Sequence, residues 1–451
     1  MVSAKSSRKR ASVHTLGCRL NQSESFIMRD QLEKAGYDTV PFGEASDLAI
    51  INTCTVTRLA DAKCRNLIRS YIRKNPEAFV AVVGCYSQIG YKEIAEIPGV
   101  DLIMGNREKL NVLDYVQLGK NEKPAIIRDR ITKEDFTIDF VGDQPYEKRA
   151  NLKIQDGCSF ICSFCIIPKA RGPARSRDME NLLAEARQMA DRGVREIVLT
   201  GVNIGTFNSK DGDLIEVLDR LDAIEGIDRI RISSIEPTTI PTELFPRMND
   251  PEHALLPFLH IPLQAGSDVV LKSMRRKYDL KEYLDFLYQA YESVTDLCLG
   301  TDIMVGYPNE GEAEFEETCR TFMDNPFSYC HVFSFSEREG TPAARMEDRL
   351  SVPEKQVRSA KLRRLSESKR YDYYEAHVGR EMTVLFEDPK NGLWPGYTDN
   401  FVRVVVESDQ DLHNQIAKVR LNRVVGDIVE GTLLKLMPNQ KVANRTMAPA
   451  P

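Results

Sequence analysis

Residues 12 to about 120 alternate short apolar runs with segments of helical periodicity. The apolar runs are typical of short buried strands and cover residues 12–16, 48–51 and 79–83. Helical spacing of apolar positions covers residues 21–35 and 57–74. This alternation predicts a parallel sheet with helices on both faces.

The same alternation resumes from Leu152 to about Glu375. Six further strands are predicted, the first from about Leu152 to the segment just before Cys158 and the others at residues 196–200, 230–233, 258–261, 298–305 and 330–335. Helices are predicted between them at 177–193, 214–224, 280–294 and 312–325. Strands joined by crossover helices predict a partial (β/α)6 barrel, whose active site lies at the C-terminal ends of the strands.

A helical segment at 357–376 leads into a region rich in short β-branched runs, at 382–386, 401–406, 416–421 and 428–434. These runs predict a small all-β barrel. The overall prediction is an α/β protein with the boundaries 1–121 (N-terminal α/β domain), 122–150 (linker), 151–376 (barrel), 377–438 (β-domain) and 439–451 (loose tail).

The composition of the 451 residues is that of an ordinary globular protein. No stretch of about twenty apolar residues is present, so no membrane span is expected. The N-terminus is polar and basic, unlike a secretory signal, and a cytoplasmic location is therefore expected. Ten cysteines in such a chain indicate metal or cluster chemistry.

Cys158, Cys162 and Cys165 lie on one short predicted loop with the spacing Cys-x3-Cys-x2-Cys. Three thiolates can hold three corners of a [4Fe–4S] cluster and leave the fourth iron without a protein ligand. That iron can chelate S-adenosylmethionine, which on reduction yields a 5′-deoxyadenosyl radical. Structural zinc remains an alternative, although zinc usually takes four ligands, and a disulfide fits an odd number of cysteines poorly.

The three predicted N-terminal strands each end in a cysteine, at Cys18, Cys54 and Cys85. Ligand sites in open α/β sheets lie just beyond the carboxyl ends of the strands, so these thiols are expected to converge. Three separate buried cysteines acting as small apolar residues are the alternative. Cys64 lies within a predicted helix and is expected to be structural.

The net charge of −6 gives no overall sign of nucleic-acid binding, but basic residues bracket the Cys158 loop. They are Lys148, Arg149, Lys153, Lys169, Arg171, Arg175 and Arg177, and a second basic run follows at 358–370. A basic patch beside a reactive centre suits a polyanionic substrate, and we expect Lys169, Arg171, Arg175 and Arg177 to contact RNA. A solvated charged face is the alternative.

Several motifs together give the chain a resemblance to the radical S-adenosylmethionine methylthiotransferases. They are residues 15–22 (TLGCRLNQ), 52–54 (NTC), 84–85 (GC), the Cys158 loop, 166–168 (IIP) with 171–172 (RG), 263–267 (LQAGS) and 301–308 (TDIMVGYP). The C-terminal region is similar to a TRAM domain, an RNA-binding β-barrel. Within the family, three motifs most resemble the MtaB branch, namely residues 16–22 (LGCRLNQ), 165–172 (CIIPKARG) and 396–401 (GYTDNF). That branch acts on N6-threonylcarbamoyladenosine next to the anticodon (position 37) of tRNA.

The resemblance implies two [4Fe–4S] clusters, a radical cluster on Cys158, Cys162 and Cys165 and an auxiliary, sulfur-bearing cluster on Cys18, Cys54 and Cys85. One S-adenosylmethionine would methylate the sulfur, and another would supply the radical that removes hydrogen from C2 of the base. That C–H has no acidity that a side chain could exploit, so acid–base catalysis cannot open it. A tRNA substrate, an electron donor, a sulfur source and a monomeric enzyme are expected.

Polar residues at the predicted barrel strand ends are candidates for binding S-adenosylmethionine: Asn203, Ser233, Ser234, Glu236, Gln264 and Asp302. Ordinary turn chemistry is the alternative for each of them. Glu236 departs from the residue type usual in the family at that strand, which puts its role in question. His260 is expected to be a structural hydrogen bonder, because the chemistry needs no imidazole.

The predicted RNA-binding β-domain is not basic, because its acids match or exceed its bases. RNA contact there would need the bases on one face, or else the domain recognises the modified base or packs on the barrel. Alternative functions are methylthiolation of isopentenyladenosine in tRNA or of a ribosomal-protein aspartate. A non-catalytic iron–sulfur module that binds RNA is an alternative of another class.

Overall fold

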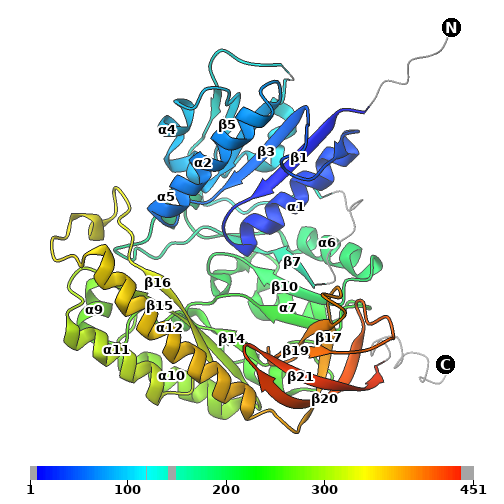
Figure 1. Cartoon of the computed structure of the whole chain (residues 1–451), viewed down its shortest axis with the longest axis vertical. Coiled ribbons are helices and arrows are strands. Elements are labelled where there is room, and N and C mark those ends of the chain that lie inside the picture. Colours follow the sequence, from blue (N-terminus) through cyan, green and yellow to red (C-terminus); the bar gives the residue numbers. More distant parts are fainter. Residues whose placement is uncertain (1–7, 118, 141–148, 438–451) are drawn as a thin grey trace.

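The computed structural model describes residues 8–117, 119–140 and 149–437, and the chain folds into three parts (Figure 1). Lys148 and the tail predicted at 439–451 lie outside the described residues. No helix in the described ranges is long and apolar enough to cross a membrane.

The N-terminal part is a six-stranded parallel sheet in the order β2-β1-β3-β4-β5-β6. Its strands are β1 (Arg10–Thr15), β2 (Asp38–Thr39), β3 (Leu48–Thr53), β4 (Phe79–Gly84), β5 (Leu102–Met104) and β6 (Ala125–Ile127), and its long helices are α1 (Arg19–Lys34) and α2 (Arg58–Lys74). Alternate residues of β3 enter two separate cores, Ile51 under α2 and Ile50 under α1. Helices therefore cover both faces, as predicted.

One expectation needs correction at the end of this sheet. Residues 122–150 were predicted to be a linker, but Ala125–Ile127 pairs in parallel with β5 as the sheet's sixth strand. The strand is only three residues long and has charged neighbours, so its pattern was too short to detect from the sequence.

The middle part contains the six parallel strands of the predicted barrel: β7 (Arg149–Lys153), β10 (Glu196–Thr200), β13 (Arg229–Ile232), β14 (Phe258–His260), β15 (Cys298–Val305) and β16 (Tyr329–Ser334). They form two three-stranded sheets, which isolated bridges between β13 and the β14 region connect. Helices α6 (Met179–Asp191), α7 (Leu214–Asp222), α10 (Leu280–Ser293) and α11 (Glu312–Asp324) cover the outside. The partial barrel has β7 and β16 at its edges.

Helix α12 (Val352–Glu375) connects the barrel to the C-terminal part and begins with a capping box formed by Ser351 and Glu354. The C-terminal part is a closed barrel of β17 (Glu381–Phe386), β18 (Trp394–Thr398), β19 (Arg403–Val406), β20 (Ile416–Val425) and β21 (Ile428–Leu436). Strand β18 was not predicted, because Pro395 and Gly396 interrupt its β-branched pattern. Figure 1 shows this small barrel beside β14, where the Phe258 and Phe401 ring centroids lie 4.7 Å apart.

Candidate active site

The Cys158 loop follows the short strand β8 (Gln155–Asp156) and leads into α5 (Ile167–Arg171). Its first turn requires glycine, because Gly157 has a φ of +72° and a Cβ there would lie 2.0 Å from the carbonyl oxygen of Pro173. The backbone N–H of Cys158 donates to the carbonyl of Gly172 over 3.0 Å. The loop therefore closes on the backbone that follows α5.

The loop is also tied to the barrel by Ser163. Its backbone N–H donates to the carbonyl of Met274 over 3.0 Å, and its hydroxyl donates to the carbonyl of Ser273 over 2.9 Å. Within the loop, the N–H of Cys165 donates to the carbonyl of Cys162 over 3.1 Å. These bonds hold the three cysteines in one turn of backbone.

Within the described residues, Cys158, Cys162 and Cys165 form no disulfide. Burial, reinforced by the neighbouring Cys162 and Cys158, raises the pKa of Cys165 to about 12. Cys162 is buried and the other two are half-buried, so three thiolates on this one loop would need a compensating cation, which the irons of a cluster would supply. The donor set therefore fits a cluster with one open iron.

Arg276 is a site residue that the sequence analysis did not single out. Its Nη1 donates to the Sγ of Cys162 over 3.3 Å, and its Nη2 forms an ion pair with Glu236. Its Nε also donates to the hydroxyl of Tyr278 over 3.0 Å. Arg276 thus holds Glu236, a candidate for S-adenosylmethionine binding, beside the Cys158 loop. The run of bases at 275–277 was the signal available in the sequence.

The N-terminal cysteines follow β1, β3 and β4, which are adjacent in the sheet. Cys18 caps the start of α1, Cys54 follows β3, and Cys85 is the first residue of α3 (Cys85–Ile89). A Cβ at Gly17 would lie 2.7 Å from the Cβ of Cys54, so glycine permits the approach. Burial, with Cys85 and Cys18 nearby, raises the pKa of Cys54 to about 11. The structure therefore brings these thiols together.

Cys64 lies beside Cys54 but is not one of the three cysteines at the strand ends. Its buried thiol on α2 donates to the carbonyl of Cys54 over 3.4 Å. That bond satisfies a backbone acceptor within the sheet domain and agrees with the expected structural role.

The two cysteine sites adjoin one another through Asn106. Its Nδ2 donates to the Sγ of Cys85 over 3.5 Å and to the carbonyl of Ala170 over 2.6 Å. Ala170 lies on α5, directly after the Cys158 loop. One amide thus contacts Cys85 of the N-terminal set and the helix that follows the Cys158 loop.

A buried ion cluster joins the same two parts of the chain. Glu24 on α1 pairs with Lys153 over 2.7 Å and with Arg171 over 3.1 Å, and it also pairs with Lys109. Asp156 pairs with Lys153 over 2.7 Å and with Arg171 over 2.9 Å. Burial of these charges is tolerated because each one has opposite partners.

Ion pairs bury three of the four residues that were expected to contact RNA. The side chains of Arg171, Arg175 and Arg177 are 1%, 9% and 0% exposed, and their partners are Glu24, Asp156 and Glu185. The expectation that these arginines contact RNA phosphates does not fit their burial. Of the four residues only Lys169 is exposed, and its ammonium donates to the carbonyl of Gly340 over 2.7 Å.

Two of the candidate residues for S-adenosylmethionine carry buried atoms without a partner. Within the described ranges, neither the Nδ2 of Asn203 nor the Oγ of Ser233 has a hydrogen-bond partner. Both residues follow the C-terminal ends of barrel strands, β10 and β13. Unsatisfied buried polar groups are uncommon, so these two fit a polar molecule bound at that end.

The remaining candidates are engaged within the protein. The backbone of Ser234 bridges to His260, and the N–H of Gln264, which has a φ of +71°, donates to the carbonyl of Asp302 over 2.8 Å. The Asp302 carboxylate lies 3.0 Å from Nε2 of His260 and 3.4 Å from Nδ1 of His331. Burial alone would raise the pKa of Asp302, but the two imidazoles outweigh it and lower that pKa. His260 is a hydrogen bonder, as expected.

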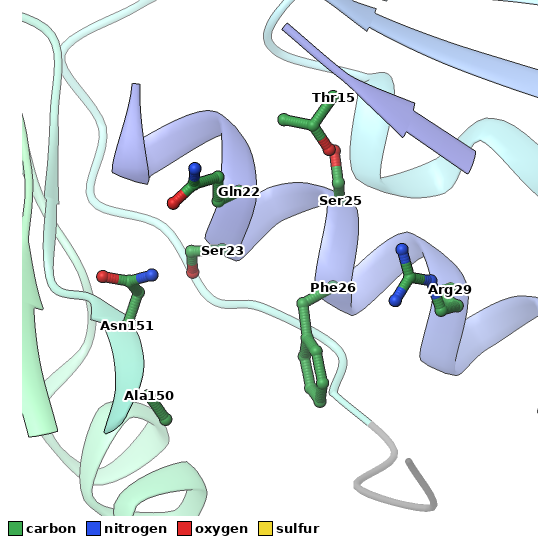
Figure 2. A pocket seen from close by; sticks show the side chains of 8 residues that line it. All are labelled: Thr15, Gln22, Ser23, Ser25, Phe26, Arg29, Ala150 and Asn151. Atoms are coloured by element: carbon green, nitrogen blue, oxygen red, sulfur yellow. The ribbon is translucent and has the colours of Figure 1, made fainter. Parts of the chain in front are cut away.

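A separate polar cavity of about 280 Å³ lies between α1 and β7 (Figure 2). Gln22, Ser23, Phe26 and Arg29 line it from one face of α1, and Asn151 lines it from β7. None of the six site cysteines is among the described residues that line it. The cavity marks the seam between the N-terminal part and the barrel.

Two family models match the chain, "Uncharacterized protein family UPF0004" at residues 10–105 and "Radical SAM superfamily" at residues 152–322. The chain is 37% identical to the threonylcarbamoyladenosine tRNA methylthiotransferase MtaB of Bacillus subtilis (strain 168), over 95% of this chain and 97% of that protein. The chain belongs to the radical S-adenosylmethionine methylthiotransferase family. Such an enzyme transfers a methylthio group and uses a [4Fe–4S] cluster with S-adenosylmethionine.

Other members of the family are nearly as similar. The MtaB protein of Aquifex aeolicus (strain VF5) is 34% identical over 85% of this chain and 94% of its own length. The tRNA-2-methylthio-N(6)-dimethylallyladenosine synthase of Anaplasma phagocytophilum (strain HZ) is 31% identical over 94% of this chain and 98% of its own length. Relatives with different substrates in their names thus match over nearly the whole chain.

A solved structure supports the fold. The radical S-adenosylmethionine methyltransferase TsrM from Kitasatospora setae, with cobalamin and a [4Fe–4S] cluster bound, matches with a TM-score of 0.51. The match covers 75% of this chain and 77% of that chain at 12% identity. At that identity the likeness concerns the fold alone.

Proposed function

We propose that this methylthiotransferase modifies tRNA and adds the methylthio group to C2 of N6-threonylcarbamoyladenosine next to the anticodon. The observation that carries the proposal is the adjoining pair of three-cysteine sites, joined through Asn106. The MtaB name of relatives that match over 85–95% of this chain supports the choice of substrate.

In this proposal Cys158, Cys162 and Cys165 hold the radical cluster. With S-adenosylmethionine bound, this cluster supplies the hydrogen abstraction that the inert C2–H requires. Asn203 and Ser233 carry unsatisfied buried polar atoms at the same barrel end and would hydrogen-bond S-adenosylmethionine. Arg276 would orient Cys162 and pair with Glu236.

Cys18, Cys54 and Cys85 hold a second [4Fe–4S] cluster that carries the sulfur. Their convergence at three adjacent strand ends supports this assignment. A sulfur source must load that site, and an electron donor must reduce the radical site. Ser234, Gln264 and Asp302 would shape the pocket through the backbone and imidazole contacts that they already make.

The RNA surface we propose lies beside α5. The exposed bases Lys169, Arg128 and Arg130 line a cleft of about 570 Å³ there. Their exposure leaves their charges available to phosphates, whereas those of Arg171 and Arg177 are buried.

We retain the domain boundaries predicted above, except that β6 moves the end of the N-terminal domain beyond Ile127. The enzyme acts as a monomer.

The proposal is tested by incubating the reconstituted protein with S-adenosylmethionine, a reductant, sulfide and anticodon stem-loops that carry different modified adenosines. Mass spectrometry of the digested RNA should find the methylthio product from the threonylcarbamoyl stem-loop. Product only from the isopentenyl stem-loop, or only from a ribosomal-protein peptide, would replace the proposed substrate. Absence of 5′-deoxyadenosine under all conditions would favour a non-catalytic RNA-binding module.

A further inference from the structure

The inside of the partial barrel is charged, although the interiors of closed (β/α)8 barrels are usually packed with branched apolar residues. Ile197 and Leu199 of β10 lie in the core beneath the helices, so Glu196 on the same strand faces the opposite way. The same alternation on β13 places Ile230 in that core and turns Arg231 inward. We call this inward-facing space the lumen.

The acids of the lumen already have partners. Glu196 pairs with Arg231 over 2.9 Å and with Arg229 over 3.0 Å. Asp399 belongs to the C-terminal part and pairs with Arg229 of β13 over 3.4 Å. Asp302 is bonded by His260 and His331. These carboxylates are therefore committed to groups that belong to the barrel itself.

Arg19 brings a further positive charge to the lumen from the N-terminal part. It lies on the same face of α1 as Ser23 and Phe26, which line the seam with β7. The groups that interact electrostatically with its guanidinium are Arg149, Arg231, Tyr329 and Glu196. In the part of the chain that the structure describes, Arg19 makes no hydrogen bond or ion pair.

Tyr329, one of the groups that interact with Arg19, also lines a cleft of about 520 Å³. Tyr329 and His331 line it from β16, and Tyr397 and Phe401 line it from the C-terminal barrel. The Tyr397 ring lies 4.9 Å from the guanidinium carbon of Arg149 and 5.2 Å from that of Arg403. Aromatic walls with guanidinium groups are suited to a nucleobase and an attached anion.

We infer that Arg19 binds the carboxylate of the N6-threonylcarbamoyl group and selects that substituent. This inference rests on the proposed function. Arg19 directly follows Cys18, and the N6 group sits close to C2 on the same adenine ring, so sulfur transfer at C2 brings the substituent toward Arg19. Guanidinium groups bind carboxylates through two parallel hydrogen bonds.

Arg19 would also reject the uncharged dimethylallyl group. That substituent would leave the guanidinium unpaired among Arg149 and Arg231 and would remove its water. A site built to bind a charged group discriminates strongly against an analogue that lacks it.

The test compares two anticodon stem-loops that differ only in the threonyl carboxylate, one free and one as the methyl ester. Binding is measured by fluorescence anisotropy, and kcat/KM by formation of the methylthio nucleoside. The wild-type enzyme should prefer the free acid by about 10- to 100-fold in both measurements. Arg19→Gln should abolish that preference, and Arg19→Lys should restore part of it. Arg29→Gln, an exposed arginine on the same helix, is the matched control.

Each outcome separates one idea from another. If Arg19→Gln weakens acid and ester equally, Arg19 contacts an RNA phosphate or has a structural role, and the inference fails. A preference unchanged by Arg19→Gln also overturns it. If the wild-type enzyme modifies neither stem-loop, the proposed function itself fails. Binding can still report on Arg19 in that case, because it does not depend on turnover.

Discussion

The two cysteine sites differ in how the chain builds them. Cys158, Cys162 and Cys165 share one loop, whose shape depends on Gly157 and on hydrogen bonds within a few residues. Cys18, Cys54 and Cys85 are far apart in sequence and meet only because β1, β3 and β4 are neighbours in the sheet. The first site is a local property of the chain, and the second is a property of the sheet.

The difference also concerns what each site can do alone. The Cys158 loop contacts Arg276 of the barrel, and Asn203 and Ser233 follow the ends of β10 and β13 in the same barrel. The N-terminal part contacts the barrel at several points, among them Asn106, Glu24 in the ion cluster, and Thr55, whose hydroxyl accepts from Arg338 over 2.6 Å. Cleavage of S-adenosylmethionine and delivery of sulfur should therefore be separable by mutation.

Replacement of Cys158, Cys162 and Cys165 by alanine should have the largest effect. Iron content after anaerobic reconstitution should fall from about eight to about four per chain, because one of two cubes loses its ligands. Both 5′-deoxyadenosine and methylthio product should disappear. Iron analysis and chromatography of the products measure this. Retained cleavage of S-adenosylmethionine would reject the radical-loop assignment.

Replacement of Cys18, Cys54 and Cys85 by alanine should abolish the methylthio product but leave 5′-deoxyadenosine release in place. The radical loop lies on a different part of the chain, so its ligands remain. Quantifying 5′-deoxyadenosine, S-adenosylhomocysteine and the methylthio nucleoside side by side separates the two steps. Wild-type product levels would show that these cysteines are merely buried thiols.

Glu24→Gln should lower the free energy of unfolding by about 3–5 kcal/mol, because three buried cations at the seam between the two sites lose their shared anion. Burial alone would raise the pKa of Glu24, but Arg171, Lys109 and Lys153 outweigh it and lower that pKa. The stability that ionised Glu24 contributes to the folded protein is thus complete above the unfolded-state pKa of about 4.3 and is lost as the pH falls below it. Denaturant titrations from pH 7 to pH 3 should show a smaller acid loss in the variant than in the wild type.

Gly157→Ala should reduce iron binding only at the Cys158 loop, because the new Cβ would meet the Pro173 carbonyl oxygen at 2.0 Å. Gly17→Ala should instead disturb the N-terminal site, where the new Cβ would meet that of Cys54 at 2.7 Å. Gly36→Ala is the control for backbone strain alone, since its φ is +85° and nothing lies within 4 Å. It should cost about 1–2 kcal/mol and leave both clusters intact. Equal iron loss in all three variants would contradict the comparison.

The smallest effect is expected from Lys169→Gln combined with Arg130→Gln, on the surface beside the radical loop. Each lost phosphate contact should lower the slope of log affinity against log salt by about one unit. The exposed Lys281→Gln on α10 is the matched control. An unchanged slope in the double variant would place the RNA surface elsewhere.

Much of this protein was predictable from local patterns. The alternation of apolar runs and helical segments predicted both α/β parts, since strands and helices bury their faces with different periods. The spacing of Cys158, Cys162 and Cys165 predicted the cluster loop, because a short loop brings its own thiols together. Short or interrupted segments were missed, among them β2, β5, β6 and β18.

By itself, therefore, the sequence determined the element types, the cysteine loop and the family, since these depend on residues close together in the chain or on exact motifs. Only the tertiary structure decided which charges are buried. Arg171 and Lys169 look alike in sequence, yet Arg171 is sealed against Glu24 and Asp156 while Lys169 stays exposed. Arg19 reaches the lumen only because α1 packs along β7. A charge acquires its role from the partners that the fold brings to it, and those partners are distant in sequence.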